Sequence, residues 1–378
     1  MGRVGTAMRD NSSIYFTNPA SYSSLDTMSF IFDFGLDYGR NFLSDGNQNY
    51  SSDDINFHHL IMGFPIAKGF GFAVGIVPMT SGFYQMNQVV TKADINYDPL
   101  VGAYDEYHSG EGSISKIFAG TGLKITKNLS LGVNMIILTG QLDRSNQFIL
   151  EDAYNVFHSS SKESLHINGI NFDYGLQYTA SLSNKRFINI GASFTSGHSY
   201  HSTHNQLSEK YTLYGSVDTI VNIADKSPTF IPGTVRLGIA FGKKDKFTTG
   251  FDYIATNWSE SKIPGSEGYA ANTREYQFGV EYIPEKYSNY SFIRRMEYRV
   301  GAHMGDNYLI INNEQLKEYG ASLGLGIPMR RSLSKVNLYI DYTLKKGSFE
   351  NNLHNDNYLT CGLSLNLYDF WFLKRKYD

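Results

Sequence analysis

The sequence predicts an all-β protein, a transmembrane antiparallel β-barrel of about 14 strands. Three observations lead to this prediction. Short segments in which apolar and polar residues alternate recur along the chain, a pattern typical of strands with lipid on one face and water on the other. The chain is polar, with a mean hydropathy of −0.31, yet its 378 residues include 28 Tyr and 25 Phe. Short and long connections alternate between the expected strands, as they do in bacterial outer-membrane barrels.

Composition excludes several other classes of protein. No run of about eighteen apolar residues occurs, so a membrane-spanning helix is not expected. The formal net charge of −3 gives no indication of nucleic-acid binding. The one cysteine, Cys361, has no partner for a disulfide or a thiolate metal site, and we interpret it as a small apolar strand residue. No signal peptide precedes Gly2, so we expect the sequence to be a mature or trimmed form.

The first element is a polar segment, residues 1–25, and the expected barrel follows over residues 26–378. Asn18-Pro19-Ala20 is a turn signal, because proline fixes its own φ and disfavours a helical conformation for the residue before it. An alternating strand follows, with Phe30, Phe32, Phe34, Leu36 and Tyr38 on one face. The other face is mostly small or acidic, which favours a wall between lipid and water over a soluble sandwich.

The rest of the chain repeats this alternation. An even number of strands places both termini on one side, which we expect to be the periplasmic side, where barrels of this class have their short turns. The alternating segments lie at residues 30–38, 55–61, 70–76, 117–123, 129–137, 170–178, 188–194, 235–241, 251–255, 276–282, 296–302, 319–325, 336–342 and 359–367. The predicted long extracellular loops are residues 41–54, 79–112, 143–164 and 198–231.

One expected strand contains an unusual concentration of residues that interrupt strands: Gly69, Gly71, Gly75 and Pro78. Glycine weakens a strand interior, and proline removes a donor from the hydrogen-bond ladder. A closed barrel has no free edge to accommodate such a strand. We therefore predict that it separates from a neighbour near Pro78 and forms a lateral gate.

Charged residues alternate with the apolar ones, so the lumen should hold a polar network. Paired carboxylates can act in acid–base catalysis, but opposite charges across a lumen also pair with each other and with a hatch, and this second interpretation is favoured. The network is predicted to comprise Asp33, Arg236, Asp252, Glu281, Glu297 and Arg299. We expect no enzyme activity and no cofactor.

Histidines offer two further candidate sites. His198, His201 and His204 have the spacing of one side of a helical turn, but their Ser/Thr-rich surroundings make a metal site the weaker interpretation. His58 and His59 are adjacent on a strand and should point to opposite faces, so they should not share a ligand.

Several motifs together indicate a family. They are Gly2-Arg3, Arg9-Asp10-Asn11 and Asn18-Pro19-Ala20 before the first strand, residues 232–238, Phe251-Asp252-Tyr253 with Trp258, and residues 371–376 at the end. The chain resembles the FadL/TodX long-chain fatty-acid transporter family of outer-membrane barrels, in a form similar to members from bacteria with a type IX secretion system. The resemblance implies 14 strands and an N-terminal hatch, residues 1–25, that plugs the lumen and includes Arg3, Asn18, Pro19 and Ala20. It also implies a third strand that kinks to open a lateral hole.

Two functions remain open at this stage. The first is passive uptake of hydrophobic small molecules with lateral exit into the membrane. The alternative is a non-transporting accessory barrel subunit of an outer-membrane machine, either a barrel-assembly or a type IX secretion complex. The expected partners are outer-membrane lipids, together with a hydrophobic ligand or with other outer-membrane proteins and lipoproteins. The polar, Tyr-rich loops are closer to a protein-contact surface than to a greasy groove.

Overall fold

A computed structural model describes residues 1–44, 49–94, 97–151, 156–212, 215, 217–264, 270–311, 314–330, 332–346 and 355–370. The terminal motif at residues 371–376 therefore lies outside the described residues. The elements are η1 (Pro19–Ser24), β1 (Ser29–Ser44), β2 (Asn49–Ala67), β3 (Phe70–Ser81), β4 (Tyr84–Val90), β5 (Tyr104–Lys124), β6 (Leu129–Leu150), β7 (His158–Ser181), η2 (Ser183–Lys185), β8 (Arg186–Thr195), β9 (His198–Tyr211), β10 (Val217–Asp225), β11 (Thr229–Ile231), β12 (Thr234–Lys243), β13 (Phe247–Thr256), η3 (Trp258–Glu260), β14 (Thr273–Tyr282), α1 (Phe292–Arg295), β15 (Glu297–Ile311), β16 (Glu314–Pro328), β17 (Lys335–Lys346) and β18 (Asn355–Phe370).

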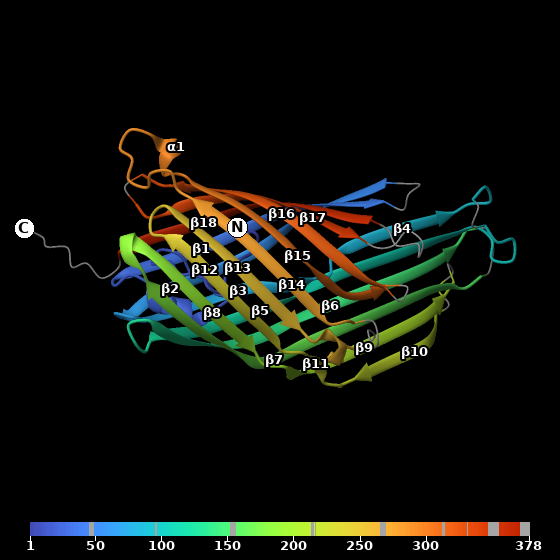
Figure 1. Cartoon of the computed structure of the whole chain (residues 1–378). Helices are drawn as coiled ribbons and strands as arrows, with labels where there is room; N and C mark the ends of the chain where they lie inside the picture. The colour runs from blue at the N-terminus through green and yellow to red at the C-terminus, as the bar shows by residue number, and fades with distance from the viewer. Residues whose placement is uncertain are drawn as a thin grey trace, which may run out of the picture.

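These strands form one closed antiparallel barrel (Figure 1). Closure comes from β1 and β18, which pair from Ser29↔Phe370 to Ser44↔Asn355. Some positions in the wall are shared by consecutive segments: β3 and β4 both pair with β5, β8 and β9 both pair with β7, and β10, β11 and β12 pair with β8 or β9. The wall therefore has 14 strand positions, and the predicted all-β barrel is confirmed.

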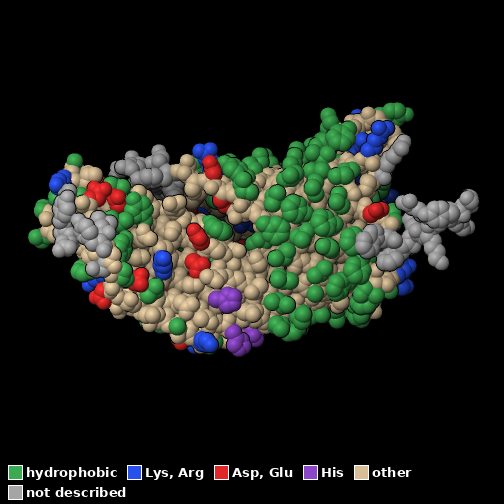
Figure 2. All heavy atoms as spheres, turned by 180° about the vertical axis from the view of Figure 1, so that it is seen from behind, with side chains coloured by type: hydrophobic (Ala, Val, Ile, Leu, Met, Phe, Trp, Pro, Cys, Tyr) green, Lys and Arg blue, Asp and Glu red, His purple; other side chains and the backbone are tan. Residues whose placement is uncertain are grey.

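The barrel surface has two zones. Hydrophobic side chains gather on one part of the outer surface, towards the end that carries α1, whereas the opposite part is largely polar (Figure 2). The hydrophobic zone includes outward residues such as Met135 on β6 and Phe172 on β7, which are paired across the two strands. At the polar end, β4, β9 and β10 project as an extension of the wall (Figure 1). No helix in the described ranges is long and apolar enough to cross a membrane.

The four segments predicted as long loops are largely strand, which corrects the loop assignment at residues 41–54, 79–112, 143–164 and 198–231. The first is replaced by a hairpin in which β1 runs to Ser44 and β2 begins at Asn49. The others contain parts of β3, β5, β6 and β7 and all of β4, β9, β10 and β11. The physical reason is that a strand outside the membrane contacts water on both faces. It then carries no apolar alternation, although its backbone pairing continues.

The N-terminal segment, residues 1–28, lies inside the barrel. Gly2 N donates to Ser322 Oγ on β16, the Gly5 and Thr6 N–H groups donate to Asp252 on β13, and η1 packs against β3, β5, β6 and β7. Strands on opposite sides of a closed wall can contact one short segment only across the interior. Nine buried residues around this segment form an apolar cluster: Ile14, Tyr22, Leu25, Ile31, Ile61, Ala73, Phe118, Ile136 and Tyr368.

Glycines in the wall allow the backbone of this segment to come close. A Cβ atom at Gly132 on β6 would lie 2.3 Å from the Pro19 carbonyl carbon, and one at Gly301 on β15 would lie 1.9 Å from Gly2 N. Both distances are far inside van der Waals contact, so a side chain at either position would displace the segment. The wall and the N-terminal segment are therefore fitted to each other at the backbone level.

Candidate functional site

The candidate site is an interruption of the hydrogen-bond ladder in the barrel wall, between β2 and the segments β3 and β4, which we call the wall opening. The β2–β3 pairing runs from Ala67↔Phe70 only as far as Leu60↔Ile76. Beyond that point, β2 from Asn49 to His59 pairs with β1, and β4 pairs with β5. Within the described residues, no ladder joins the two edges that face each other here.

The sequence around Pro78 explains why the ladder stops. Proline has no N–H to donate, and the register of β3 against β5 shifts between Pro78 and Thr80. The interruption therefore lies next to Val77-Pro78, in the strand where the gate was predicted.

The three glycines assigned to the gate have other structural roles. Gly69 adopts φ +78° in the β2–β3 turn, a conformation that glycine tolerates without strain. Gly71 faces the N-terminal segment, where a Cβ would lie 2.0 Å from the Tyr22 carbonyl oxygen. At Gly75 a Cβ would lie 2.8 Å from the Leu60 carbonyl oxygen on β2. Of the four predicted gate residues, only Pro78 lies where the pairing breaks.

The prediction that His58 and His59 point to opposite faces is wrong. The register of β1 against β2 shifts between Gly35 and Leu36, so β2 carries a bulge at His58. The two Nδ1 atoms are 2.5 Å apart, and the ring centroids are 4.7 Å apart. A bulge cannot be read from the sequence of one strand, because it depends on the register with its neighbour.

Acidic residues surround the two histidines on the inner side of the wall. His59 Nε2 is 3.0 Å from Asp33 Oδ1, and His58 Nε2 is 3.8 Å from Asp37 Oδ2. The Tyr339 hydroxyl, from β17, donates to Asp37 at 2.5 Å. One strand edge of the opening is thus lined on its inner side by carboxylates, imidazoles and tyrosine hydroxyls. Asp33, predicted as part of a lumen network, belongs to this cluster.

The N-terminal segment lies next to the opening. The Phe16 ring stacks on Phe118 of β5 with a centroid distance of 6.1 Å, and it lies 6.4 Å from the His59 ring. Phe16 and Val77 both pack against the apolar cluster of the interior. Molecules entering between β2 and β3 would therefore meet this segment.

The predicted hatch residues occupy different places in the segment. Asn18 is fully buried and caps η1 by accepting from the Ala20 N–H at 3.1 Å, while its Nδ2 donates to backbone carbonyls of β7 and β8. Pro19 is the first residue of η1, and Ala20 is buried beside it. Arg3 is half-exposed, and its Nη2 lies 3.5 Å from Asp341 Oδ1.

Three of the six predicted network residues are brought together on β14 and β15. The Arg299 guanidinium pairs with Glu281 at 2.7 Å and also with Glu297. Lys335 joins them from β17, with its Nζ 3.4 Å from Glu297 Oε1 and 3.8 Å from Asp10 of the N-terminal segment. Lys335 and Asp10 were missed because nothing in the sequence indicated which lumen position would meet the segment.

Asp33 belongs to the histidine cluster, and the last two of the six network residues lie elsewhere. Asp252 accepts the backbone N–H groups of Gly5 and Thr6, both at 2.8 Å. Arg236 on β12 forms no ion pair within the part of the chain that the structure describes. The predicted single network is therefore divided into an ion-pair cluster, a backbone anchor and the histidine cluster beside the opening.

The second histidine group does not form a helical turn. His198, His201 and His204 lie on β9, where successive side chains alternate, and His204 pairs with Glu163 at 2.7 Å. No group of three His, Cys, Asp or Glu residues among the described ones is arranged to hold a metal ion.

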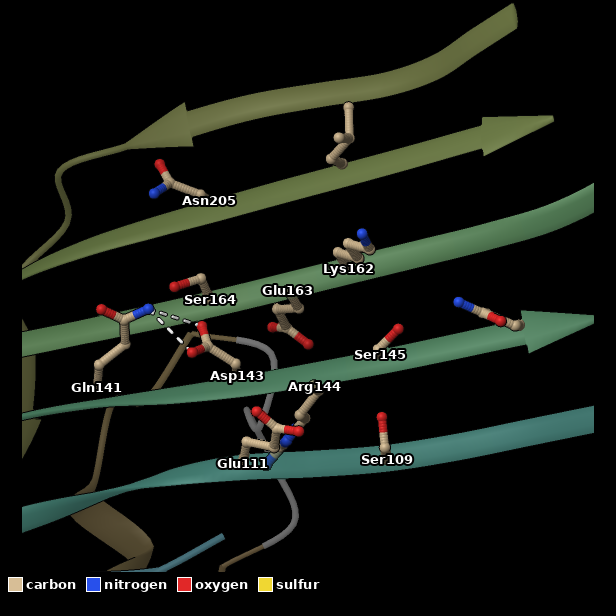
Figure 3. A pocket seen from close by; sticks show the side chains of 12 residues that line it. Ser109, Glu111, Gln141, Asp143, Arg144, Ser145, Lys162, Glu163, Ser164 and Asn205 are labelled. Carbon is tan, nitrogen blue, oxygen red and sulfur yellow. Dashed lines mark hydrogen bonds between the residues drawn. The ribbon is translucent and has the colours of Figure 1, made fainter. Parts of the chain in front are cut away.

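A separate polar hollow of about 600 Å³ lies on the polar part of the wall. The residues that line it come from β5, β6, β7 and β9 (Figure 3). Its residues on β6, such as Gln141 and Asp143, belong to the same alternating set as the β6 residues that face outward in the hydrophobic zone. Gln141 Nε2 donates to both oxygens of Asp143 at 2.9 Å, as the dashed lines in Figure 3 show. The hollow therefore lies on the outer surface of the barrel, in its polar part beyond the hydrophobic zone.

Comparison with known families decides the membership of the chain. A family model described as BamG matches residues 1–378. The chain belongs to the BamG family. No curated protein matches it at a significant level.

Solved structures match this BamG-family barrel over nearly its whole length. The Pseudomonas putida toluene transporter TodX is 15% identical, with an alignment that covers 98% of each chain and a TM-score of 0.62. A Pseudomonas aeruginosa FadL homologue is 13% identical with a TM-score of 0.61, and the alignment covers 97% of this chain and 96% of that one. The CymD monoaromatic hydrocarbon channel is 14% identical with a TM-score of 0.58, covering 92% and 90%. The predicted resemblance to FadL/TodX barrels is confirmed for the fold.

Proposed function

We propose that this BamG-family barrel is a non-transporting accessory subunit of an outer-membrane protein complex of the barrel-assembly type. The observation that carries the proposal is the occupied interior. The N-terminal segment and its apolar cluster occupy one part, and a second buried cluster, Ile114, Leu138, Leu165, Ile167 and Tyr200, lies on β5, β6, β7 and β9. Ion pairs of Arg299 with Glu281 and Glu297 line the wall, and Lys335 connects this cluster to Asp10 of the segment. A hydrophobic molecule crossing this interior would have to displace packed and charged groups.

Family membership and the outer surface support the same proposal. Membership of the BamG family supports association with other outer-membrane proteins. The hollow on the extension is lined by Ser, Gln, Asn and charged residues, which suit a hydrated protein contact better than an apolar ligand. In this proposal the N-terminal segment acts as a permanent plug, the short turns and both termini face the periplasm, and the extension projects outside the cell.

A second candidate function is passive uptake of hydrophobic small molecules with lateral exit into the bilayer. It is favoured by the wall opening beside β2 and β3, together with the similarity in fold to a toluene transporter and a monoaromatic hydrocarbon channel. In that case Val77 and Pro78 would border the exit, and the N-terminal segment would have to move.

Purification in mild detergent from native outer membranes separates the two functions. We expect other outer-membrane proteins or lipoproteins to co-purify in stoichiometric amounts and to be identified by mass spectrometry. A parallel measurement compares toluene uptake by cells with and without the barrel, and we expect no difference. A barrel that purifies alone while raising toluene uptake would contradict the subunit proposal and support transport.

A further inference from the structure

We propose that the wall opening receives an extended strand from a partner protein, which pairs with the free edge of β2 and lies between β2 and β4. This inference rests on the proposed subunit function and names the mode of contact. The edges concerned are β2 from Asn49 to His59 and the segment from Val77 to Val90.

Backbone chemistry favours a polypeptide as the occupant. A strand edge presents a row of N–H and C=O groups, and an extended peptide satisfies them by adding a strand. The opening begins at Leu60 and Ile76, within the outward apolar set of the wall, where water is scarce and unpaired backbone is costly. A hydrocarbon ligand has no donors or acceptors, so it would leave these backbone groups without hydrogen bonds.

Side chains along β2 indicate the character of the guest strand. On the outer face, Ile55 is 79% exposed and Phe57 is half-buried, so an apolar neighbour would cover them. On the inner face lie Asp37 on β1 and Asp54 on β2, the latter accepting from the Tyr358 hydroxyl at 3.0 Å. Residues facing these carboxylates should be polar or basic. The expected guest therefore alternates apolar residues towards lipid with polar or basic residues towards the lumen.

β16 is paired on both sides at Leu323 and supplies a control position. Leu323 on β16 is 63% exposed, comparable to Ile55, but it pairs with Val300 on one side and Ile340 on the other. Lipid exposure is thus similar at Leu323 and Ile55, while only Ile55 lies on a strand with a free edge. Any signal that depends on strand addition should appear at Ile55 and not at Leu323.

Photo-cross-linking in native cells tests the proposal. A photoreactive phenylalanine analogue is placed singly at Ser51, Ser52, Asp53, Ile55 or Leu323 in the full-length chain, and cross-linked peptides are mapped by mass spectrometry. We expect Ser51, Asp53 and Ile55 to reach residues of one partner segment that are spaced two apart, in order along the segment. Leu323 should give no such cross-link.

The outcomes also separate this inference from the subunit proposal. Cross-links to lipid alone, or to partner residues without a two-residue spacing, would overturn strand addition. If other outer-membrane proteins still co-purify in that case, the subunit function stands and only the contact mode is wrong. Absence of both co-purification and cross-links would overturn both.

Discussion

At the residue scale, Asp252 is the main polar anchor between the wall and the N-terminal segment. It is 1% exposed and accepts two backbone N–H groups, from Gly5 and Thr6. Asp252→Ala would leave both donors buried without an acceptor, at about 1–3 kcal/mol for each unsatisfied group. We expect a loss of that order in the free energy of unfolding, measured by urea titration in lipid vesicles. Asp218→Ala, at an exposed site on β10, is the control and should have little effect; equal losses in the two variants would contradict the anchor.

The pH response of the N-terminal segment should depend on Asp10, which lies outside the membrane-spanning strands. Burial alone would raise the pKa of the Asp10 carboxyl, but the ammonium groups of Lys335 and Lys286 and the Asn11 N–H hold that pKa below its ordinary value of 3.8. Because the pKa is lower in the folded state, this contribution to stability is present above the unfolded-state pKa. It is lost as the pH falls through the folded-state pKa.

We therefore expect the segment to stay in place from pH 7 down to about pH 4 and to loosen only in more acidic solution. Single-channel conductance in planar bilayers, measured as the pH is lowered, should rise below that range. The Asp10→Asn variant lacks the titrating group and should show a smaller rise. An identical pH profile in the variant would show that Asp10 does not cause the pH dependence of the conductance.

At the scale of the strand, β7 crosses both zones of the surface, so the free-energy cost of placing an arginine on it should depend on position. Phe172 and Ser164 lie on the same face of β7, because they are eight residues apart in a continuous register with β6. Phe172→Arg places a charge in the hydrophobic zone and should destabilise the barrel by about 2–4 kcal/mol if it lies near the midplane. Ser164→Arg lies on the polar extension and should cost little. Equal costs in urea titrations would contradict the assignment of the two zones.

The same strands show what the sequence could and could not predict. Alternation identified the lipid-facing parts of the wall, such as Phe30 to Tyr38, because only one face of those strands may be polar. It missed β4, β9 and β10, where both faces meet water and the alternation disappears. It also missed the bulge at His58, because register belongs to a pair of strands. Likewise, Lys335 and Asp10 meet only through the path of the N-terminal segment, which no local pattern encodes.

At the scale of the whole molecule, the wall closes independently of the N-terminal segment. β1 and β18 pair over their full lengths, and the segment binds only to the inner surface. Removing part of the segment should therefore leave a folded barrel with a wider path through it. This separation allows the role of the segment as a plug to be tested without unfolding the wall.

Deletion of residues 3–13 removes the groups that bind Asp252 and Lys335 as well as the charged Arg9, while η1 remains. We expect ion conductance in planar bilayers to rise at pH 7, because the polar lumen that this part of the segment occupied fills with water. The Asp218→Ala variant, changed at an exposed site on β10, leaves the segment intact and should keep the low conductance of the unaltered chain at that pH. Heat-modifiable migration in gel electrophoresis checks that both variants are folded barrels. A folded deletion variant with unchanged conductance would mean that this part of the segment does not limit flow, and that the remaining η1, with its packing against β3, β5, β6 and β7, closes the barrel alone.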